Sequence, residues 1–372
     1  MKKIRVCCFL EKWESGGIES FLNSLFENTD LNKFEIDVVA AKLGESVFTD
    51  RLRKRGVSFF ELSGNPRSAK NRARLRRLIK ERHYDVLHLN VFHALTFAYA
   101  KDAERLGVPV RIAHAHGAGL RKSLTRPLKL LLHRLGRSLY GRALTARLAC
   151  SDVSARFLFG KAADEIIRNG IDTRRFSYSE SARLDARREL KISHAPTVGH
   201  VGRLEWEKNQ AYLMRAFARV IESVPAARLL LVGEGPDRAS LSALAEELEI
   251  SDSVVLYGTS DNVPELLSAM DVFALPSIFE GLGIVAIEAQ ASGLPTLLSE
   301  AVPPEAHATS LAESFPLTDG GEALAKRIIS LLKNLPERRS YADEIELAGY
   351  SSSATVRQIE KYYTSSSGDT EL

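Results

Sequence analysis

Short runs of apolar residues alternate with amphipathic segments along most of this chain. In the first half, the apolar runs predict buried strands at residues 3–10, 34–40, 58–61, 85–89, 110–115 and 148–151. The segments between them carry apolar residues at helical spacing, as in Phe21, Leu22, Leu25 and Phe26. Strands that alternate with helices are typical of a doubly wound parallel sheet, so this half is predicted to be an α/β domain.

The second half repeats the alternation without repeating the sequence. Its predicted strands are 197–204, 228–235, 253–258 and 271–277, and its predicted helices begin near 209 and cover 238–248, 263–269 and 284–291. A polar run rich in Arg and Ser reaches about Ala195 and is interpreted as a linker. We therefore predict an N-terminal Rossmann-like domain over 1–190 and a C-terminal one over 191–350. Residues 351–372 are predicted to form a helix that crosses back to the N-terminal domain, followed by a disordered tail.

Length and composition fit a globular protein of two domains. The 372 residues are 45% hydrophobic and 26% charged, and no apolar run is long enough to cross a bilayer. The short apolar stretch at 4–10 leads into charged residues rather than a signal-peptide cleavage site. The three cysteines, Cys7, Cys8 and Cys150, have no metal-binding spacing and suit a reducing compartment. We expect a cytoplasmic protein.

The net charge of +4 conceals a strong asymmetry. Residues 1–190 contain 37 Lys and Arg against 21 Asp and Glu, whereas the remainder contains 14 against 26. Such a split indicates that the N-terminal half faces something anionic: a membrane surface, nucleic acid or a phosphorylated acceptor.

One segment concentrates this positive charge. Residues 121–147 contain eight Lys or Arg and no acid, with leucines at 124, 128, 131, 132, 135 and 139. Two interpretations stay open. The segment forms either a core-packing helix with a solvated basic face, or a helix that lies on the anionic inner face of the cytoplasmic membrane. Neither this segment nor the similar 72–82 has interleaved aromatic residues for base stacking, which argues against nucleic acid.

The stretch 279–299 carries the chemistry most clearly. Glu280 precedes a glycine-rich loop, Gly281-Leu282-Gly283, and the loop runs into a predicted helix from Ile284 that contains Glu288. Unpaired N–H groups at a helix N-terminus attract anions and hydroxyl groups. The alternative is that the two glutamates are solvated residues that complement the helix dipole.

Other candidate residues follow predicted strands and should meet at one sheet edge. In the C-terminal half these are Arg203, Lys208, Gly233 and Thr259. In the N-terminal half Gly16 and Gly17 lie between the first strand and first helix, where an ordinary turn is the alternative. His114 and His116 end a strand, where a structural role is the alternative.

Two cations, helix N–H groups and carboxylates together suit a nucleotide-sugar. Arg binds phosphate oxygens with a planar fork, and carboxylates accept hydrogen bonds from sugar hydroxyls. The chain contains no Asp-x-Asp pair to hold a metal. Fixed positive charge is therefore expected to stabilise the diphosphate leaving group, with no metal and no cofactor.

The segments VGRLEWEKNQ, LVGEGPDR and FEGLGIVAIEAQASGLP resemble the C-terminal motifs of retaining glycosyltransferases of family 4. GGIES, HAHG and IIRNGIDTRRF resemble their N-terminal counterparts, especially in bacterial enzymes of capsular or exopolysaccharide synthesis. The resemblance implies the GT-B fold, in which two Rossmann-like domains face each other across a cleft. It also implies transfer of a sugar, taken as UDP-linked, to a polyprenyl-diphosphate-linked or glycan acceptor with retention of anomeric configuration.

The resemblance further implies a role for each candidate residue. Arg203 and Lys208 would bind the donor diphosphate and Glu288 the ribose hydroxyls. Glu280 with the N–H groups of 281–284 would hold the donor sugar. His116 would lie beside the transferred sugar, although the choice between His114 and His116 stays open. The remaining donor-binding residues would be Gly16, Gly17, Gly233, Gly281, Leu282, Gly283, Ile284 and the backbone of Thr259.

Rival functions are a nucleotide-sugar epimerase or phosphorylase-like enzyme of the same fold, and a non-catalytic nucleotide-binding regulator. The sequence does not rank hexose, hexosamine and deoxy-sugar donors.

Overall fold

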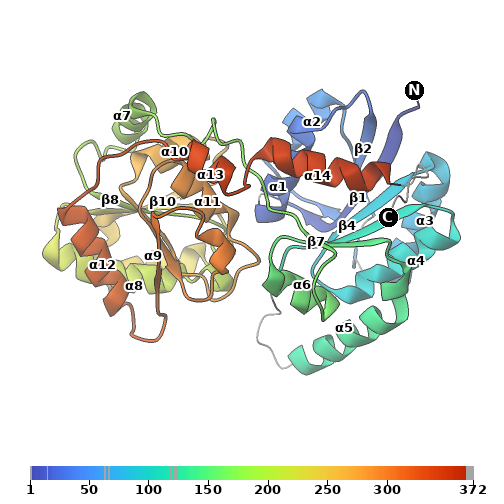
Figure 1. The fold of residues 1–372 in the computed structure, drawn as a ribbon. Helices are drawn as coiled ribbons and strands as arrows, with labels where there is room; N and C mark the ends of the chain where they lie inside the picture. Colours follow the sequence, from blue (N-terminus) through green and yellow to red (C-terminus); the bar gives the residue numbers. More distant parts are fainter. Residues whose placement is uncertain are drawn as a thin grey trace. The chain divides into compact units, whose positions relative to one another are not determined.

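The computed structural model describes residues 2–14, 16–62, 64–65, 68–117, 119 and 125–365. The chain divides into two compact units, one made of residues 1–170 with 352–372 and the other of residues 171–351 (Figure 1). Each unit contains one parallel sheet flanked by helices, which confirms the predicted α/β class.

The sheet of the N-terminal unit has the order β3-β2-β1-β4-β5-β6-β7. All six residues of the central strand β4 are buried, as expected of a sheet covered on both faces. The strands are β1 (Ile4–Trp13), β2 (Phe34–Leu43), β3 (Ser58–Glu61), β4 (Val86–Val91), β5 (Val110–Ala115), β6 (Ala146–Ala149) and β7 (Glu165–Ile166).

Side chains of β1 alternate between two cores, one on each face of this sheet. Cys7 and Phe9 pack into one core, whereas Val6, Cys8 and Leu10 pack into the other. The helices are α1 (Gly17–Asn28), α2 (Thr49–Arg55), α3 (Ala69–Arg82), α4 (Ala98–Arg105), α5 (Arg126–Tyr140), α6 (Asp152–Phe159) and α14 (Ser352–Thr364), with short 3-10 turns η1 (Ala94–Phe97) and η2 (Gly141–Ala143).

Helix α14 comes from the end of the chain and belongs to the N-terminal unit. It packs against α1 and β1 (Figure 1). Its side chains Val356, Ile359 and Tyr363 are buried in the second core. The Tyr363 hydroxyl lies 2.8 Å from His88 Nδ1. The predicted disordered tail falls mainly on residues outside the described part of the chain, as does Leu124 of the basic segment.

The C-terminal unit has a sheet with the order β10-β9-β8-β11-β12-β13. Its strands are β8 (Thr197–Val201), β9 (Arg228–Val232), β10 (Val254–Gly258), β11 (Val272–Leu275), β12 (Thr296–Ser299) and β13 (Ala312–Phe315). Its helices are α7 (Glu180–Glu189), α8 (Gln210–Ser223), α9 (Arg238–Glu247), α10 (Val263–Ala269), α11 (Ile284–Ala291), α12 (Glu322–Lys333) and α13 (Ala342–Leu347), with 3-10 turns η3 (Trp206–Lys208), η4 (Ser251–Ser253) and η5 (Pro304–Ala306).

The boundary between the units differs from the one expected at residue 190. The polar run interpreted as a linker contains α7, which packs against α10. Arg183 Nη2 and Arg187 Nη1 lie 2.6 and 3.3 Å from the carboxylate oxygens of Asp271, which is 4% exposed. Because these arginines are held by a buried counter-charge, the run is part of the C-terminal unit, and the division falls between 170 and 171.

Candidate active site

The loops after β8, β9 and β10 are joined by backbone hydrogen bonds at the carboxyl edge of the C-terminal sheet. The N–H of Gly202 donates to Val232 O at 2.9 Å, and that of Leu204 donates to Glu234 O at 2.9 Å. The N–H of Gly233 donates to Gly258 O at 2.8 Å. The loops that carry Arg203, Gly233 and Thr259 therefore form one surface, as the sequence predicted from their position after strands.

Glycine is required where these loops approach each other. Gly233 has a φ of +141°, and a Cβ there would lie 2.1 Å from Gly202 O. At Gly235 a Cβ would lie 2.2 Å from Leu204 O. Any larger residue would separate the backbones, so the close contact of the loops depends on both glycines.

The loop after β11 joins the same surface through side chains and backbone. Ile278 N donates to Glu207 O at 2.8 Å, and Asn209 Nδ2 donates to Pro276 O at 3.1 Å. These bonds bring Lys208 to Glu280, with Lys208 Nζ 2.5 Å from Glu280 Oε1. The two candidates that stand 72 positions apart in the chain thus form an ion pair.

Ser277 is part of this arrangement, although the sequence analysis did not single it out. Its hydroxyl is fully buried and donates to Glu280 Oε1 at 2.7 Å, while Ser299 Oγ donates to Ser277 O at 2.6 Å. Glu280 is therefore held by a hydroxyl and a cation. A serine three residues before the glutamate, directly after a buried strand, was the available signal.

Arg203 lies beside the ion pair on the same loop. Its side chain is 39% exposed, and its Nε lies 3.4 Å from Glu205 Oε2. Burial raises the pKa of Glu205, while Arg203 and Lys208 lower it and Glu207 and Glu280 raise it. The carbonyl of Arg203 accepts a hydrogen bond from Gln210 Nε2 at 2.8 Å. Arg203, Glu207, Lys208 and Glu280 therefore form a cluster of charge around Glu205.

The glycine-rich loop leads into α11 as expected. Gly283 has a φ of +81° and occupies the N-cap position of α11, which starts at Ile284. Gly281, Leu282 and Gly283 are all buried, and so is every residue of α11. The helix is therefore a core element, and its first residue lies four positions after Glu280.

Glu288 lies on the second turn of α11 and differs from Glu280 in its environment. It is 6% exposed, and burial raises its pKa to about 7 while Arg175 lowers it. Arg175, which donates from Nη2 to Asp261 O at 2.8 Å, was not among the predicted residues. The alternative of two solvated glutamates is wrong for Glu288 and also for Glu280, whose side chain is 10% exposed.

In the N-terminal unit, Gly16 caps α1 and Gly17 begins it. A Cβ at Gly16 would lie 2.8 Å from Glu19 Oε2, whereas at Gly17 it would meet nothing within 4 Å. The N–H of Glu14 donates to Glu19 Oε1 at 3.3 Å, so a carboxylate folds back over the start of the helix. Gly17 faces open space, and its approach to phosphates stays a prediction.

The two candidate histidines lie together beside α1. The rings of His114 and His116 are 4.2 Å apart, and both contact Phe21 of α1. His114 is fully buried, while His116 is 8% exposed and its Nε2 lies 2.8 Å from Asn90 Oδ1. Burial lowers the pKa of His116 to about 3, so its ring is neutral at physiological pH.

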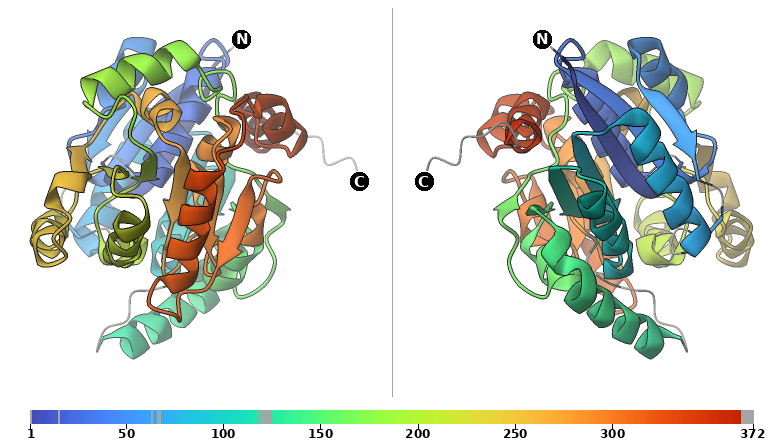
Figure 2. Two further views of the ribbon diagram at one scale, coloured as in Figure 1. Left: turned by 90° about the vertical axis from the view of Figure 1, so that its left-hand side faces the viewer. Right: turned by 90° about the vertical axis from the view of Figure 1, so that its right-hand side faces the viewer.

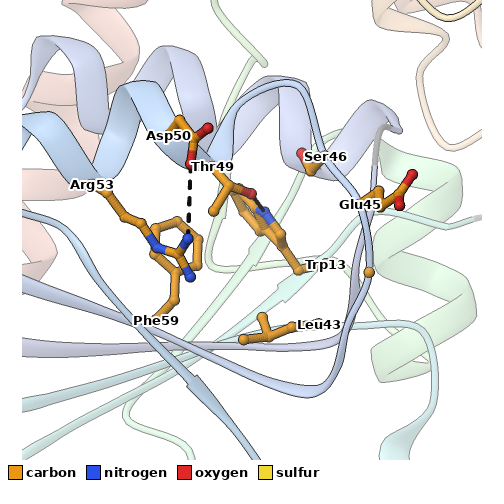
Figure 3. A pocket seen from close by; sticks show the side chains of 9 residues that line it. Trp13, Leu43, Glu45, Ser46, Thr49, Asp50, Arg53 and Phe59 are labelled. Atoms are coloured by element: carbon orange, nitrogen blue, oxygen red, sulfur yellow. Dashed lines mark hydrogen bonds and ion pairs between the residues drawn. The ribbon is translucent and has the colours of Figure 1, made fainter.

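A pocket of about 280 Å³ opens at the carboxyl ends of β1 and β2 in the N-terminal unit (Figure 3). Trp13 Nε1 donates to Thr49 Oγ1 at 2.9 Å on its wall, and Arg53 Nη1 lies 3.8 Å from Asp50 Oδ1. No motif in the sequence pointed to this pocket. Its lining residues are Trp13, Leu43, Gly44, Glu45, Ser46, Thr49, Asp50, Arg53 and Phe59.

Within the described ranges, no cluster of three or more His, Cys, Asp or Glu is arranged to hold a metal. The described helices include none with both the length and the apolar character needed to span a bilayer.

Two protein-family models match the chain. Residues 15–175 match the Glycosyltransferase Family 4 model, and residues 183–346 match the model of glycosyl transferases group 1. Together these two matches cover most of both structural units.

Individual proteins agree with the family models. The chain is 27% identical to the putative glycosyltransferase EpsF of Bacillus subtilis over 96% of each chain. It is 26% identical to the UDP-Gal:alpha-D-GlcNAc-diphosphoundecaprenol alpha-1,3-galactosyltransferase of Escherichia coli over 76% of each. The crystal structure of Anabaena Alr3699/HepE in complex with UDP and glucose superimposes with a TM-score of 0.79 at 20% identity, covering 97% of this chain and 100% of that one. The chain therefore belongs to the glycosyltransferases with the GT-B fold, with a family 4 domain followed by a group 1 domain.

Proposed function

We propose that this glycosyltransferase moves a sugar from a UDP-sugar to a lipid-linked saccharide acceptor in surface-polysaccharide synthesis, with retention of configuration and without a metal ion. The observation that carries the proposal is the Lys208–Glu280 ion pair, braced by Ser277 on a surface where four strand-end loops are joined. The similar Anabaena protein binds UDP and glucose, and the similar Escherichia coli enzyme is a galactosyltransferase for UDP-Gal and alpha-D-GlcNAc-diphosphoundecaprenol, which supports this choice of donor and acceptor.

In this proposal the cations of the loop after β8 bind the diphosphate. Lys208 and Arg203 would neutralise the negative charge that grows on the leaving group as the bond between C1 and the diphosphate oxygen breaks. The acceptor oxygen would bond to C1 on the same face, and its proton would pass to the departing diphosphate, so that UDP leaves. The buried carboxylate of Glu288 would accept hydrogen bonds from the ribose hydroxyls.

Glu280 would orient the sugar. Lys208 and Ser277 both contact Oε1 of Glu280. These two contacts fix the carboxylate and leave its second oxygen, Oε2, for the sugar. Neutral His116, near the start of α1, would contact the transferred sugar. Each of these assignments predicts a separable kinetic effect, because loss of a diphosphate contact weakens nucleotide binding, whereas loss of a sugar contact slows transfer.

Donor binding can be tested by calorimetry with UDP, using GDP as the competing base. We expect Lys208→Ala and Arg203→Ala each to weaken UDP binding roughly ten- to hundredfold, the loss of a charge-assisted hydrogen bond of about 1.5–3 kcal/mol. Lys326→Ala is the matched control, because Lys326 is exposed and pairs with Glu322 on α12. Equal UDP affinity in all four proteins would remove the donor site, and tighter binding of GDP would correct the base.

Metal independence is tested separately by activity in EDTA. We expect transfer to continue at an unchanged rate, because positive side chains take the place of a divalent ion in the proposed site. Analysis of the product by NMR then gives its anomeric configuration. Loss of activity that Mn²⁺ restores would contradict the metal-free mechanism, and an inverted product would contradict retention.

A further inference from the structure

Helix α5 presents its apolar side to solvent. Five leucines, spaced as on one face of a helix, are between 37% and 64% exposed, and they make up five of the eleven large apolar side chains that are exposed in the described part of the chain. We call them the leucine ridge: Leu128, Leu131, Leu132, Leu135 and Leu139. A helix of a soluble domain normally turns such a stripe toward the core, so this orientation needs an explanation.

Two small or polar residues fix the helix in this orientation. A Cβ on Gly136 would lie 2.6 Å from Leu95 N and 2.7 Å from Ala94 O, so the helix touches the backbone of η1 directly. On the same side, His133 Nδ1 accepts from Ala94 N at 3.3 Å and its Nε2 lies 3.0 Å from Phe157 O. One neutral tautomer satisfies both bonds, with Nε2 as the donor. The glycine and histidine are buried, and the leucines are therefore held outward.

Positive charge borders the leucine ridge. Arg126, Lys129 and Arg134 are exposed on α5, and the helix contains no acidic residue. The helix lies at the periphery of its unit in both views of Figure 2. This arrangement contradicts the core-packing interpretation of the basic segment, because a core-packing helix would bury its leucines.

We propose that the leucine ridge is a docking face for an anionic phospholipid bilayer. The leucines would enter the boundary between headgroups and acyl chains, while the bordering cations contact lipid phosphates. A second copy of the chain is a poorer occupant, because two identical ridges would bring like charges together. This proposal rests on the proposed function, because a lipid-linked acceptor is presented at a membrane surface.

The experiment is flotation of the full chain with vesicles of phosphatidylcholine, with or without phosphatidylglycerol, in the absence of donor and acceptor. We expect binding to the anionic vesicles that weakens with added salt. Combined Leu131→Gln, Leu135→Gln and Leu139→Gln should reduce it at least about tenfold, because less apolar surface enters the bilayer. Leu184→Gln and Leu347→Gln replace leucines that are 54% and 88% exposed on the other unit, and both should bind as the parent does.

A second variant separates charge from apolar insertion. Arg126→Gln, Lys129→Gln and Arg134→Gln together should remove the salt-sensitive part of binding. Absence of flotation by the parent, or equal flotation of parent and ridge variant, overturns the proposal. Concentration-dependent dimerisation that the ridge variant abolishes, without vesicle binding, would assign the face to self-association instead. Calorimetry with UDP on the same variants keeps the tests apart, because vesicle binding without nucleotide binding would refute only the proposed function.

Discussion

At the scale of single residues, the two glutamates of the candidate site have different electrostatic environments. Glu280 is held by a cation 2.5 Å away and by a serine hydroxyl. Glu288 is buried on α11, and the cation that acts on it is the exposed Arg175. Because Glu288 is buried and its cation is exposed, Glu288 binds a proton more readily than a carboxylate in water does.

Glu288 should therefore make stability depend on pH. Its pKa is raised from 4.5 to about 7 by burial, so the folded protein binds the proton more tightly than the unfolded chain does. Its contribution to the free energy of unfolding is then fully present below pH 4.5 and is lost as pH rises through 7, by about 3 kcal/mol in total. We expect Glu288→Gln to remove this loss of unfolding free energy with rising pH. Urea unfolding of the C-terminal unit at a series of pH values measures it.

The difference between parent and variant at each pH isolates this one group. Glu246→Gln, at an exposed position of α9, is the control and should keep the parent profile. Parallel profiles for the parent and Glu288→Gln would show that the carboxylate is not in a desolvated site.

At the scale of elements, the candidate site depends on how closely the strand-end loops approach. Its geometry comes from Gly233 and Gly235, at which a Cβ would overlap backbone oxygens of the loop after β8. The side chains that would bind ligand stand on these loops, so an error in loop spacing moves Arg203 and Lys208 together.

We expect Gly233→Ala to destabilise the C-terminal unit by about 2–3 kcal/mol, through the strained φ of +141° and the overlap with Gly202 O. UDP binding should weaken in the same variant, as measured by thermal unfolding with and without nucleotide. Gly141→Ala is the control, because φ there is −62° and a Cβ meets nothing within 4 Å. An unchanged melting temperature for Gly233→Ala would show that the loops can separate at no cost.

Elements whose signal is local could be predicted from the sequence. The strands β8 to β11 and the turn into α11 have apolar runs that end in glycine-rich loops, and they were predicted with small shifts at the ends. Helix α7 was missed because its arginines read as solvent-exposed, while their counter-charge Asp271 lies 84 to 88 residues further along the chain. Ser277 was missed for a similar reason. Its role comes from a hydrogen bond to Glu280 Oε1, and such a contact is visible only in the folded loop.

At the scale of the whole molecule, the N-terminal unit contains a group of buried neutral histidines. The rings of His88 and His114 stack at 5.4 Å, and His116 continues the row. Burial lowers the pKa of His88 to about 3 and that of His114 well below its usual value. In acid, burial opposes protonation of each ring in the folded state. The stability of the whole N-terminal unit should therefore fall at low pH.

The sign follows from the lowered pKa values. Stability from the neutral rings is present above pH 6.5 and is lost as pH falls toward 3, because the unfolded chain then binds more protons. We expect His114→Leu to reduce the slope of unfolding free energy against pH by about 1.4 kcal/mol per pH unit below pH 6. Chemical unfolding followed for the N-terminal unit measures this slope. His194→Leu, at an exposed position, should retain it, and an equal slope in all three proteins would contradict the prediction.

The return of α14 to the first unit has a consequence for biosynthesis. Val356, Ile359 and Tyr363 complete a core whose other members come from residues before 170. A ribosome must therefore finish the entire second unit before the first can close over Phe34 and His88, which Tyr363 contacts. The nascent first unit should remain a substrate for chaperones until then, although it is the first to emerge.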